Sequence, residues 1–239
     1  MTIGARIVDY EHKRRSFEGL LAQDDALPSP RPGVLVFPDW RGRSSAQEQV
    51  AAKLATWGYA AFAVDLYGKG IRGTTPEQCE GLMTPFISDR AMLRERLLHT
   101  LEIVRELRGI DAHNIAAVGF CFGGLCALDL ARAGAPVKAV ASFHGLFTPP
   151  GLPIADPIES KVIAFHGWND PLAPPADIVA LGRELTAARA DWQIHAYGGT
   201  MHAFTVEDAD NSAAGILYNE RSAGRAWAAL RGFLAEACG

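Results

Sequence analysis

Short, continuously apolar runs alternate with amphipathic stretches from residue 34 to the end of this sequence. Apolar runs of this length are typical of parallel strands that are covered on both faces. The order strand, helix, strand predicts a parallel sheet wound with right-handed crossovers. We expect six core strands, at Val34–Phe37, Ala60–Leu66, Ile115–Gly119, Val137–Phe143, Val162–His166 and Gln193–Tyr197.

The helices and loops around these strands can also be predicted. Ser45-Ala46-Gln47-Glu48 is a capping-box pattern that predicts the start of a helix ending at Gly58, and leucines at helical spacing predict a second helix ending at Gly109. Ile7–Leu20 is expected to form an antiparallel hairpin at the sheet edge, and 68–88 a long loop insertion that overhangs the site. The sequence predicts an α/β fold, with a mostly parallel sheet, helices on both faces and an antiparallel N-terminal edge.

Length and charge limit the classes of function. At 239 residues the chain suits one domain, residues 1–239, and 23 basic against 27 acidic residues offer no basic surface for nucleic acid. No apolar stretch suits a signal peptide or a membrane span. Four cysteines at irregular spacing predict neither a disulfide framework nor a zinc site. We expect a cytoplasmic protein, monomeric or homodimeric, with a small-molecule partner.

The most informative motif is Gly119-Phe120-Cys121-Phe122-Gly123, between the third expected strand and a helical segment. A nucleophile elbow has this order of strand, sharp turn and helix, and its flanking glycines avoid collisions in a strained backbone. The following helix directs its N-terminal dipole at the sulfur, which favours the reactive thiolate. Cys121 is therefore the expected nucleophile, although an isolated cysteine in such a turn is more often a small apolar filler.

An acid and a histidine follow in the order that this fold uses. Asp170 comes after the strand ending at His166, and His202 lies in a glycine-rich loop after the last strand. Both positions belong to the carboxyl edge of the sheet, where ligands of open α/β sheets bind. We expect Cys121, His202 and Asp170 to form a catalytic triad. The plainer alternative is that Asp170 only caps a turn before Pro171.

The loop after the first core strand is the expected second half of an oxyanion hole. In this fold a backbone N–H from that loop pairs with the one following the nucleophile, which here gives Trp40 and Phe122. Asp39 would then lie near the thiol, or it could simply begin a turn. His144 and His166 also end strands, where lone histidines are more often structural groups.

Taken together, these motifs resemble the dienelactone hydrolase family of the α/β-hydrolase fold. The resemblance rests on the elbow at Cys121, the Asp170 turn, the ending from Gly198 to Phe204 and the strand end at Asp65, and it spans nearly the whole chain. It implies a Cys-His-Asp triad, no metal or cofactor, and attack on a carboxylic ester or lactone. It also implies an acid that modulates the thiol, a glutamate in the family and Asp39 here.

The resemblance also bears on the substrate. The family's lactone enzymes hold a substrate carboxylate with arginines, one of them four residues after the histidine, where this sequence has Val206. Arg72 or Arg90 could supply another cation. An apolar site without a fixed cation predicts a neutral, apolar ester, because burying an unpaired carboxylate is costly. The remaining expected pocket residues are Phe37, Phe204 and His144.

Three other functions stay open at this point. Family members also act on phosphotriesters, which are neutral and bulky. A metal-dependent hydrolase could be built from Asp39, His144, Asp170 and His202, although the sequence lacks closely paired histidines. A binding protein that kept the fold and lost catalysis is the third, since fold alone does not fix function.

Overall fold

The computed structural model describes residues 2–239, and its contacts divide the chain into two compact units, Met1–Val118 and Gly119–Gly239. The two are described separately below. The division falls two residues before the elbow cysteine. Cys121, Asp170 and His202 therefore all belong to the second unit, whereas Asp39 and Trp40 belong to the first.

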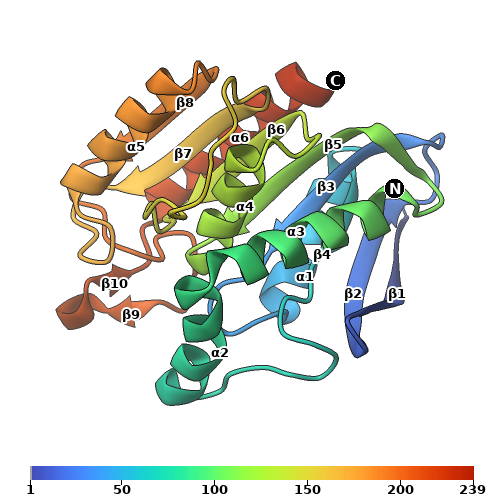
Figure 1. Cartoon of the computed structure of the whole chain (residues 1–239), viewed down its shortest axis with the longest axis horizontal. Coiled ribbons are helices and arrows are strands. Elements are labelled where there is room, and N and C mark those ends of the chain that lie inside the picture. Colours follow the sequence, from blue (N-terminus) through green and yellow to red (C-terminus); the bar gives the residue numbers. More distant parts are fainter. Residues whose placement is uncertain (1) are drawn as a thin grey trace. The chain divides into compact units, whose positions relative to one another are not determined.

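The first unit combines an antiparallel hairpin, further strands and three helices (Figure 1). Its elements are β1 (Ile3–His12), β2 (Arg15–Asp24), β3 (Arg31–Phe37), α1 (Ser45–Thr56), β4 (Ala60–Ala63), α2 (Pro76–Ser88), α3 (Arg90–Arg105) and β5 (Ile110–Phe120), the last of which runs two residues past the division. β1 pairs with β2 and β2 with β4 in antiparallel fashion, while β3 and β4 are parallel. In Figure 1, α3 lies in front of these strands and α1 behind them.

The β1–β2 hairpin turns through Lys13 and Arg14, which both have positive φ, at 49° and 63°. Two central residues of this kind give a turn whose twist matches that of the flanking strands. Tyr10 and Phe17 face each other across the pair and stack with ring centroids 5.3 Å apart. The hairpin confirms the expected antiparallel edge and is longer than the predicted Ile7–Leu20.

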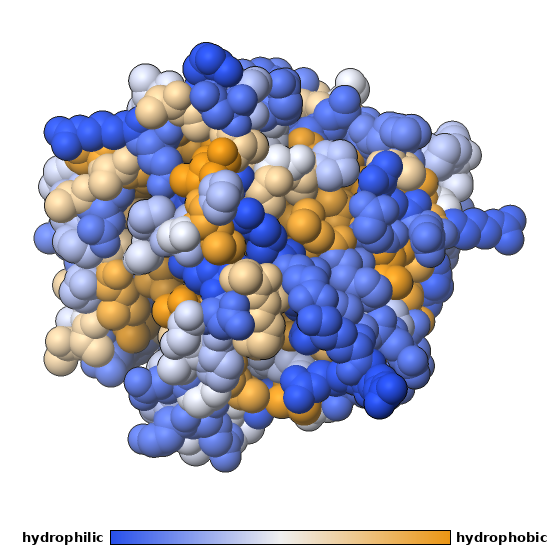
Figure 2. Space-filling view, viewed as in Figure 1, coloured by the Kyte–Doolittle hydropathy of each residue, from blue (hydrophilic) through white to orange (hydrophobic). Residues whose placement is uncertain are grey.

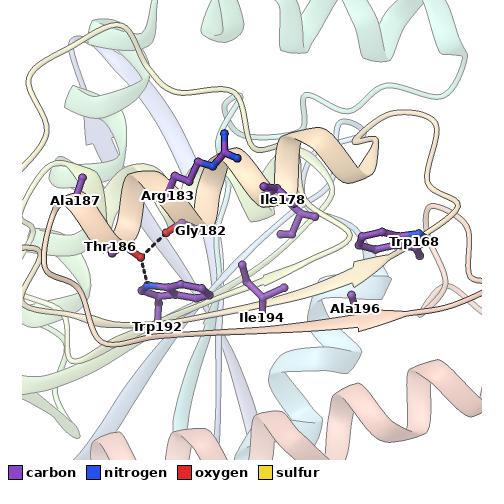
Figure 3. Close-up of a pocket in the computed structure, with 10 residues that line it drawn as sticks. Trp168, Ile178, Gly182, Arg183, Thr186, Ala187, Trp192, Ile194 and Ala196 are labelled. Carbon is purple, nitrogen blue, oxygen red and sulfur yellow. Dashed lines mark hydrogen bonds between the residues drawn. The ribbon is translucent and has the colours of Figure 1, made fainter.

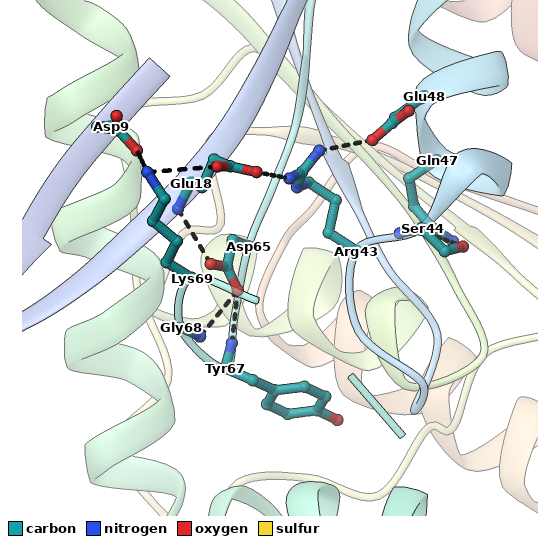
Figure 4. Close-up of polar contacts among 10 residues, drawn as sticks. All are labelled: Asp9, Glu18, Arg43, Ser44, Gln47, Glu48, Asp65, Tyr67, Gly68 and Lys69. Atoms are coloured by element: carbon teal, nitrogen blue, oxygen red, sulfur yellow. Dashed lines mark hydrogen bonds and ion pairs between the residues drawn. The ribbon is translucent and has the colours of Figure 1, made fainter. Parts of the chain in front are cut away.

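A buried polar cluster organises the loops after β3 and β4 (Figure 4). Arg43 is 5% exposed and forms ion pairs with Glu18 and Glu48, and Asp65 accepts the backbone N–H groups of Glu18, Tyr67 and Gly68 at 2.9–3.1 Å. Buried charges are tolerated only with such partners. The cluster thereby fixes the path of both loops.

The second unit has a parallel sheet of β6, β7 and β8 between helices (Figure 1). Its elements are α4 (Phe122–Arg132), β6 (Ala139–Phe143), β7 (Lys161–Gly167), α5 (Pro175–Ala187), β8 (Trp192–Tyr197), β9 (Asp210–Asn211), a 3₁₀ turn (Ser212–Ala214), β10 (Ile216–Leu217) and α6 (Glu220–Cys238). Figure 1 shows α4 in front of β6 and β7 and α6 behind them. Both faces of these strands are covered, which explains their apolar sequences.

The structure corrects several predicted boundaries. The helix cap is Ser44 rather than Ser45, because the Ser44 hydroxyl accepts the Ala46 N–H and Gln47 Oε1 accepts the Ser44 N–H. β4 ends at Ala63, since the chain then turns at Asp65. The predicted loop 68–88 contains α2 in its second half, capped by Thr75 with Pro76 at its first position. The threonine and the proline together are the start signal of this helix.

Hydrophilic side chains cover most of the face shown in Figure 2, with apolar patches between them, as is usual for proteins in water. Within residues 2–239 no helix combines the length and the apolarity needed to cross a bilayer. All four cysteines are free thiols. The secondary structure agrees with the expected α/β-hydrolase fold, with a mostly parallel sheet and an antiparallel N-terminal edge.

Candidate active site

Cys121 occupies a strained turn between β5 and α4. Its backbone has φ 54° and ψ −117°, a conformation that side-chain-bearing residues rarely adopt. A Cβ on Gly119 would lie 1.9 Å from the carbonyl oxygen of Gly123, so this position has room only for glycine. The turn thus has the strained backbone and the close approach that the glycine spacing predicts for an elbow.

Backbone hydrogen bonds hold this turn in place. The Cys121 N–H donates to the carbonyl of Phe143 at the end of β6, 3.0 Å away, and the Cys121 carbonyl accepts the Gly124 N–H at 2.9 Å. Cys121 is only half-buried, whereas Cys126 is fully buried inside α4. Because α4 begins at Phe122, its positive end is directed at Cys121.

Asp170 lies in the turn after β7 and uses both of its carboxylate oxygens. Oδ1 accepts the N–H groups of Leu172 and Ala173 at 2.8 and 3.3 Å, and Oδ2 lies 2.7 Å from Nδ1 of His202. The carboxylate is 2% exposed. Asp170 therefore does cap the turn, as the plainer alternative states, and the same carboxylate also contacts His202.

His202 is held from both sides by backbone contacts. Its N–H donates to the Gly215 carbonyl at 2.9 Å, and its carbonyl accepts the Leu217 N–H at 3.0 Å. The residue also forms a parallel bridge with Ile216. These contacts anchor the histidine backbone within the glycine-rich loop, so any movement of the imidazole takes place about its side-chain bonds.

The Asp170 turn and the His202 loop are joined directly. Trp168 N–H donates to the Tyr197 carbonyl at 2.9 Å, Asn169 N–H to the Thr200 carbonyl at 2.8 Å, and the Asn169 side chain accepts the Gly199 N–H at 3.0 Å. Sequence reasoning missed Asn169, although its place next to the expected acid was a signal.

Two glycines allow this close approach. A Cβ on Gly167 would lie 2.6 Å from the carbonyl oxygens of Thr200 and Met201, and one on Gly215 would lie 2.3 Å from Pro171. Each glycine lets one loop pass against the other. Together with the hydrogen bonds, they place the acid beside the histidine.

Electrostatics link His202 to Cys121 as well as to Asp170. Burial alone would lower the pKa of His202, but its hydrogen bonds with Asp170 and Cys121, and the charges of both groups, outweigh burial and raise the pKa to about 10. Since Nδ1 faces Asp170, Nε2 is the ring atom left for the thiol. At neutral pH the imidazole of His202 is therefore protonated.

The expected residues of the first unit lie in the loops after its strands. Asp39 begins a turn, because its carboxylate accepts the Arg41 N–H at 2.8 Å and also pairs with the Arg41 guanidinium at 2.7 Å. The Trp40 carbonyl accepts the Tyr67 hydroxyl at 3.0 Å. Phe37 is fully buried and Arg72 is exposed. The roles predicted for Asp39 and Trp40 toward Cys121 stay predictions.

Among the expected pocket residues of the second unit, Phe204 and His144 surround His202. Their rings meet edge to face 5.4 Å apart, and the His144 ring lies 5.1 Å from that of His202. Phe122 and Phe204 are fully buried, and Val206 is half-buried. These aromatic side chains support the loop from within the unit.

A separate groove of about 630 Å³ lies between α5 and β8 on the same unit (Figure 3). Trp168, Ile178, Trp192 and Ile194 line it, and the Trp192 indole donates to the Thr186 hydroxyl at 3.1 Å. None of the three expected triad residues lines this groove. The groove and the residues of the expected chemistry are therefore distinct features.

The metal-dependent alternative finds no support in the side-chain arrangement. No cluster of three or more histidine, cysteine, aspartate or glutamate side chains suited to a metal ion occurs anywhere in the part of the chain that is described. His202 instead directs Nδ1 at Asp170, and the Asp39 carboxylate is paired with Arg41.

Comparison with known proteins agrees with the geometry. The model of the dienelactone hydrolase family matches residues 17–238. The solved structure m3DLH is 36% identical with a TM-score of 0.94, and a dienelactone hydrolase-like promiscuous phosphotriesterase from metagenomic libraries is 33% identical with a TM-score of 0.93; each alignment covers 99% of both chains. A putative carboxymethylenebutenolidase of Synechocystis is 28% identical over 238 residues, 94% of each chain.

The protein has the α/β-hydrolase fold, which it shares with an enzyme from a deep-sea metagenome library at 19% identity, 98% coverage of both chains and a TM-score of 0.66. More narrowly, the chain belongs to the dienelactone hydrolase family. The expected family and fold are thus both confirmed.

Proposed function

We propose that this protein hydrolyses carboxylic esters or lactones with Cys121 as the nucleophile, His202 as the acid–base group and Asp170 as the residue that orients His202. One observation carries the proposal. A strained elbow cysteine, a buried carboxylate and an imidazole that interacts with both lie within one compact unit. This is the geometry that activated cysteine nucleophiles require.

The raised pKa of His202 sets the starting state of the proposed reaction. With the imidazole protonated, the Cys121 thiolate attacks the carbonyl carbon and the carbonyl π electrons move to oxygen. The tetrahedral oxyanion collapses, the bond to the leaving oxygen breaks, and His202 gives its proton to the departing alkoxide. A thioester and a neutral imidazole remain.

Water completes the cycle. Neutral His202 takes a proton from water while the hydroxide adds to the thioester carbon, and collapse of the second oxyanion expels the Cys121 thiolate and the acid product. The imidazolium and thiolate are then restored. We assign the oxyanion to the N–H of Phe122 at the start of α4, and the N–H of Trp40 is the second donor that the family resemblance implies.

The proposed substrates are neutral and apolar. The position four residues after the histidine holds the half-buried Val206, so the cation that binds a carboxylate in the family's lactone enzymes is missing there. An anionic substrate would lose solvation without gaining an ion pair at this position. The partner we expect is a small neutral ester; we propose no cofactor.

A second candidate activity is hydrolysis of neutral phosphotriesters by the same thiolate. It is favoured by the similarity to the metagenomic enzyme described as a promiscuous phosphotriesterase. Attack of the thiolate on phosphorus would break the bond to one alkoxide, which takes the proton of His202, and would leave the phosphoryl group bonded to Sγ of Cys121 in place of the thioester.

A substrate panel tests both activities. p-Nitrophenyl esters of increasing chain length, dienelactone and a neutral phosphotriester are assayed with wild type and Cys121→Ala. The proposal expects turnover of the neutral esters that is lost in Cys121→Ala. Full activity of Cys121→Ala would contradict the assigned nucleophile. If wild type cleaves none of these substrates and Cys121 is not alkylated at neutral pH, the alternative of a binding protein that retained the fold is favoured.

A further inference from the structure

His144 is a buried histidine that takes no part in the proposed proton transfers. It follows β6, and its N–H donates to the Phe165 carbonyl at 2.8 Å. Its φ is +37°, a conformation that is unfavourable for a residue with a Cβ. The side chain is 1% exposed, and its Nδ1 has no hydrogen-bond partner within residues 2–239. A strained, incompletely satisfied group of this kind calls for a physical reason.

His144 makes three contacts with one short loop. Its Nε2 lies 2.8 Å from the Thr205 hydroxyl, and its ring meets those of Phe204 and His202 edge to face. The loop residues 202, 204 and 205 are therefore all fixed against the same side chain. The preceding residue, Phe143, accepts the N–H of Cys121. One segment, Phe143 and His144, thus contacts both members of the proposed reactive pair.

The charge state of His144 suits this place. Burial first, and the charge of His202 second, keep the pKa of His144 well below its usual value. His144 therefore stays neutral while His202 carries a proton. Among the side chains in ring contact with His144, which are His202, Phe204 and Phe120, only His202 titrates.

We propose that His144 is a positioning residue which, together with Thr205, holds the imidazole of His202 in the orientation that serves Asp170 and Cys121 at once. The Asp170 bond fixes one atom of the ring, but rotation about that bond still changes where Nε2 points. The neutral ring of His144 packs edge to face against His202 and prevents this rotation. The inference rests on the Cys121–His202 pair of the proposed function and extends it to a residue outside the triad.

The test follows the thiolate directly and needs no substrate. The rate of Cys121 alkylation by iodoacetamide is measured against pH by peptide mass spectrometry in wild type, His144→Phe and Thr205→Val. If the His202 imidazole is no longer held in its orientation, it stabilises the Cys121 thiolate less. The midpoint of alkylation then moves up by about one pH unit in His144→Phe, which is an approximately tenfold loss of thiolate below the midpoint. Thr205→Val keeps the shape of the side chain and is expected to move the midpoint in the same direction by a smaller amount.

His166→Phe is the matched control. His166 is also fully buried, lies one residue before the end of β7 and has no hydrogen bond to either ring nitrogen within residues 2–239. Its ring contacts are Phe147 and Trp168, and although its charge would interact with those of Asp170 and His202, burial lowers its pKa and keeps it neutral. A purely structural role would lower the melting temperature of both phenylalanine variants and leave both midpoints alone. An unchanged midpoint in His144→Phe, or an equal shift in His166→Phe, would overturn the proposal. If His144→Phe does not fold, an unchanged midpoint in Thr205→Val decides against it.

Ester kinetics separate this inference from the proposed function. The positioning role predicts a lower kcat with little change in KM for His144→Phe, whereas a substrate-contact role would raise KM. If no ester is cleaved by wild type and the alkylation midpoint still shifts, the proposed function fails and the positioning role stands.

Discussion

Oδ2 of Asp170 lies 2.7 Å from Nδ1 of His202, while Oδ1 of the same carboxylate holds the turn that follows β7. One side chain thus shapes its own loop and orients the imidazole. The arrangement allows the two roles to be separated, because an amide retains one acceptor oxygen for the turn and loses the charge that faces the histidine.

Asp170→Asn is expected to keep the fold and lose most of the activity. The amide oxygen can still accept the N–H groups of Leu172 and Ala173, so the turn should persist, but the melting temperature should fall because the buried His202 loses its charged partner. Its NH₂ group would oppose the Nδ1 proton, and kcat should fall by roughly 10⁴-fold, as in other triads. Steady-state hydrolysis of a p-nitrophenyl ester and thermal unfolding measure the two effects. A loss of less than tenfold would mean that Asp170 does not orient the base.

Gly119→Ala is expected to disrupt the elbow. The new methyl group would lie 1.9 Å from the Gly123 carbonyl oxygen, and this contact is backbone that cannot move aside without unwinding the start of α4. We expect a loss of activity with a stability loss of several kcal/mol, on the order of other severe overpacking substitutions. Urea unfolding and ester hydrolysis provide the measurements.

Gly224→Ala is the matched control for this substitution. Gly224 is exposed in α6, and a Cβ there has no atom within 4 Å. Alanine should be neutral or stabilising by up to about 1 kcal/mol, because it is the better helix former. Equal tolerance of alanine at both positions would contradict the tight elbow.

The pairing of His202 also predicts how stability depends on pH. Burial opposes protonation, but the partners Asp170 and Cys121 raise the pKa of His202 from 6.5 to about 10. The folded state therefore keeps a proton on His202 that the unfolded state releases above pH 6.5, but the thiolate of the proposed pair lacks a proton that the unfolded thiol keeps up to about pH 8.5. These two proton counts cancel below about pH 8.5, so stability from the pairing is lost as the pH rises from there through 10.

Urea unfolding of wild type and His202→Gln at intervals from pH 6 to pH 10 measures this dependence. The free energy of unfolding of wild type should fall more steeply with pH than that of the variant over this window. Parallel curves for the two proteins would contradict a protonated His202 in the folded state.

Val206→Arg is expected to change substrate preference. An arginine four residues after the histidine restores the cation that the resemblance assigns to carboxylate recognition. Charge-assisted pairing with an anionic lactone should raise kcat/KM for that substrate relative to a neutral ester by about tenfold, or ~1.4 kcal/mol. Val206→Lys is the control, because a point charge lacks the bidentate geometry. An unchanged ratio in both variants would remove residue 206 from substrate recognition.

Much of this structure could be predicted because short local patterns in the sequence determine it. The apolar strands, the hairpin and the elbow at Cys121 follow from patterns a few residues long, and the chain order of Cys121, Asp170 and His202 follows from the fold. Helix α2 was missed because its capping threonine and Pro76 stand in a segment that looks like a loop. The roles of Asn169, Gly167 and Thr205 depend on contacts between segments some 30 to 60 residues apart, which no local pattern encodes.

The central claim is that Cys121 forms a covalent bond with the substrate. Wild type and Cys121→Ala are mixed with an ester that hydrolyses slowly after acylation, quenched in acid and examined by intact-protein and peptide mass spectrometry. The account predicts one acyl group per wild-type chain, located on the peptide that contains Cys121, and none on the variant. Ester turnover by wild type with no acylated Cys121 at any quench time would contradict it.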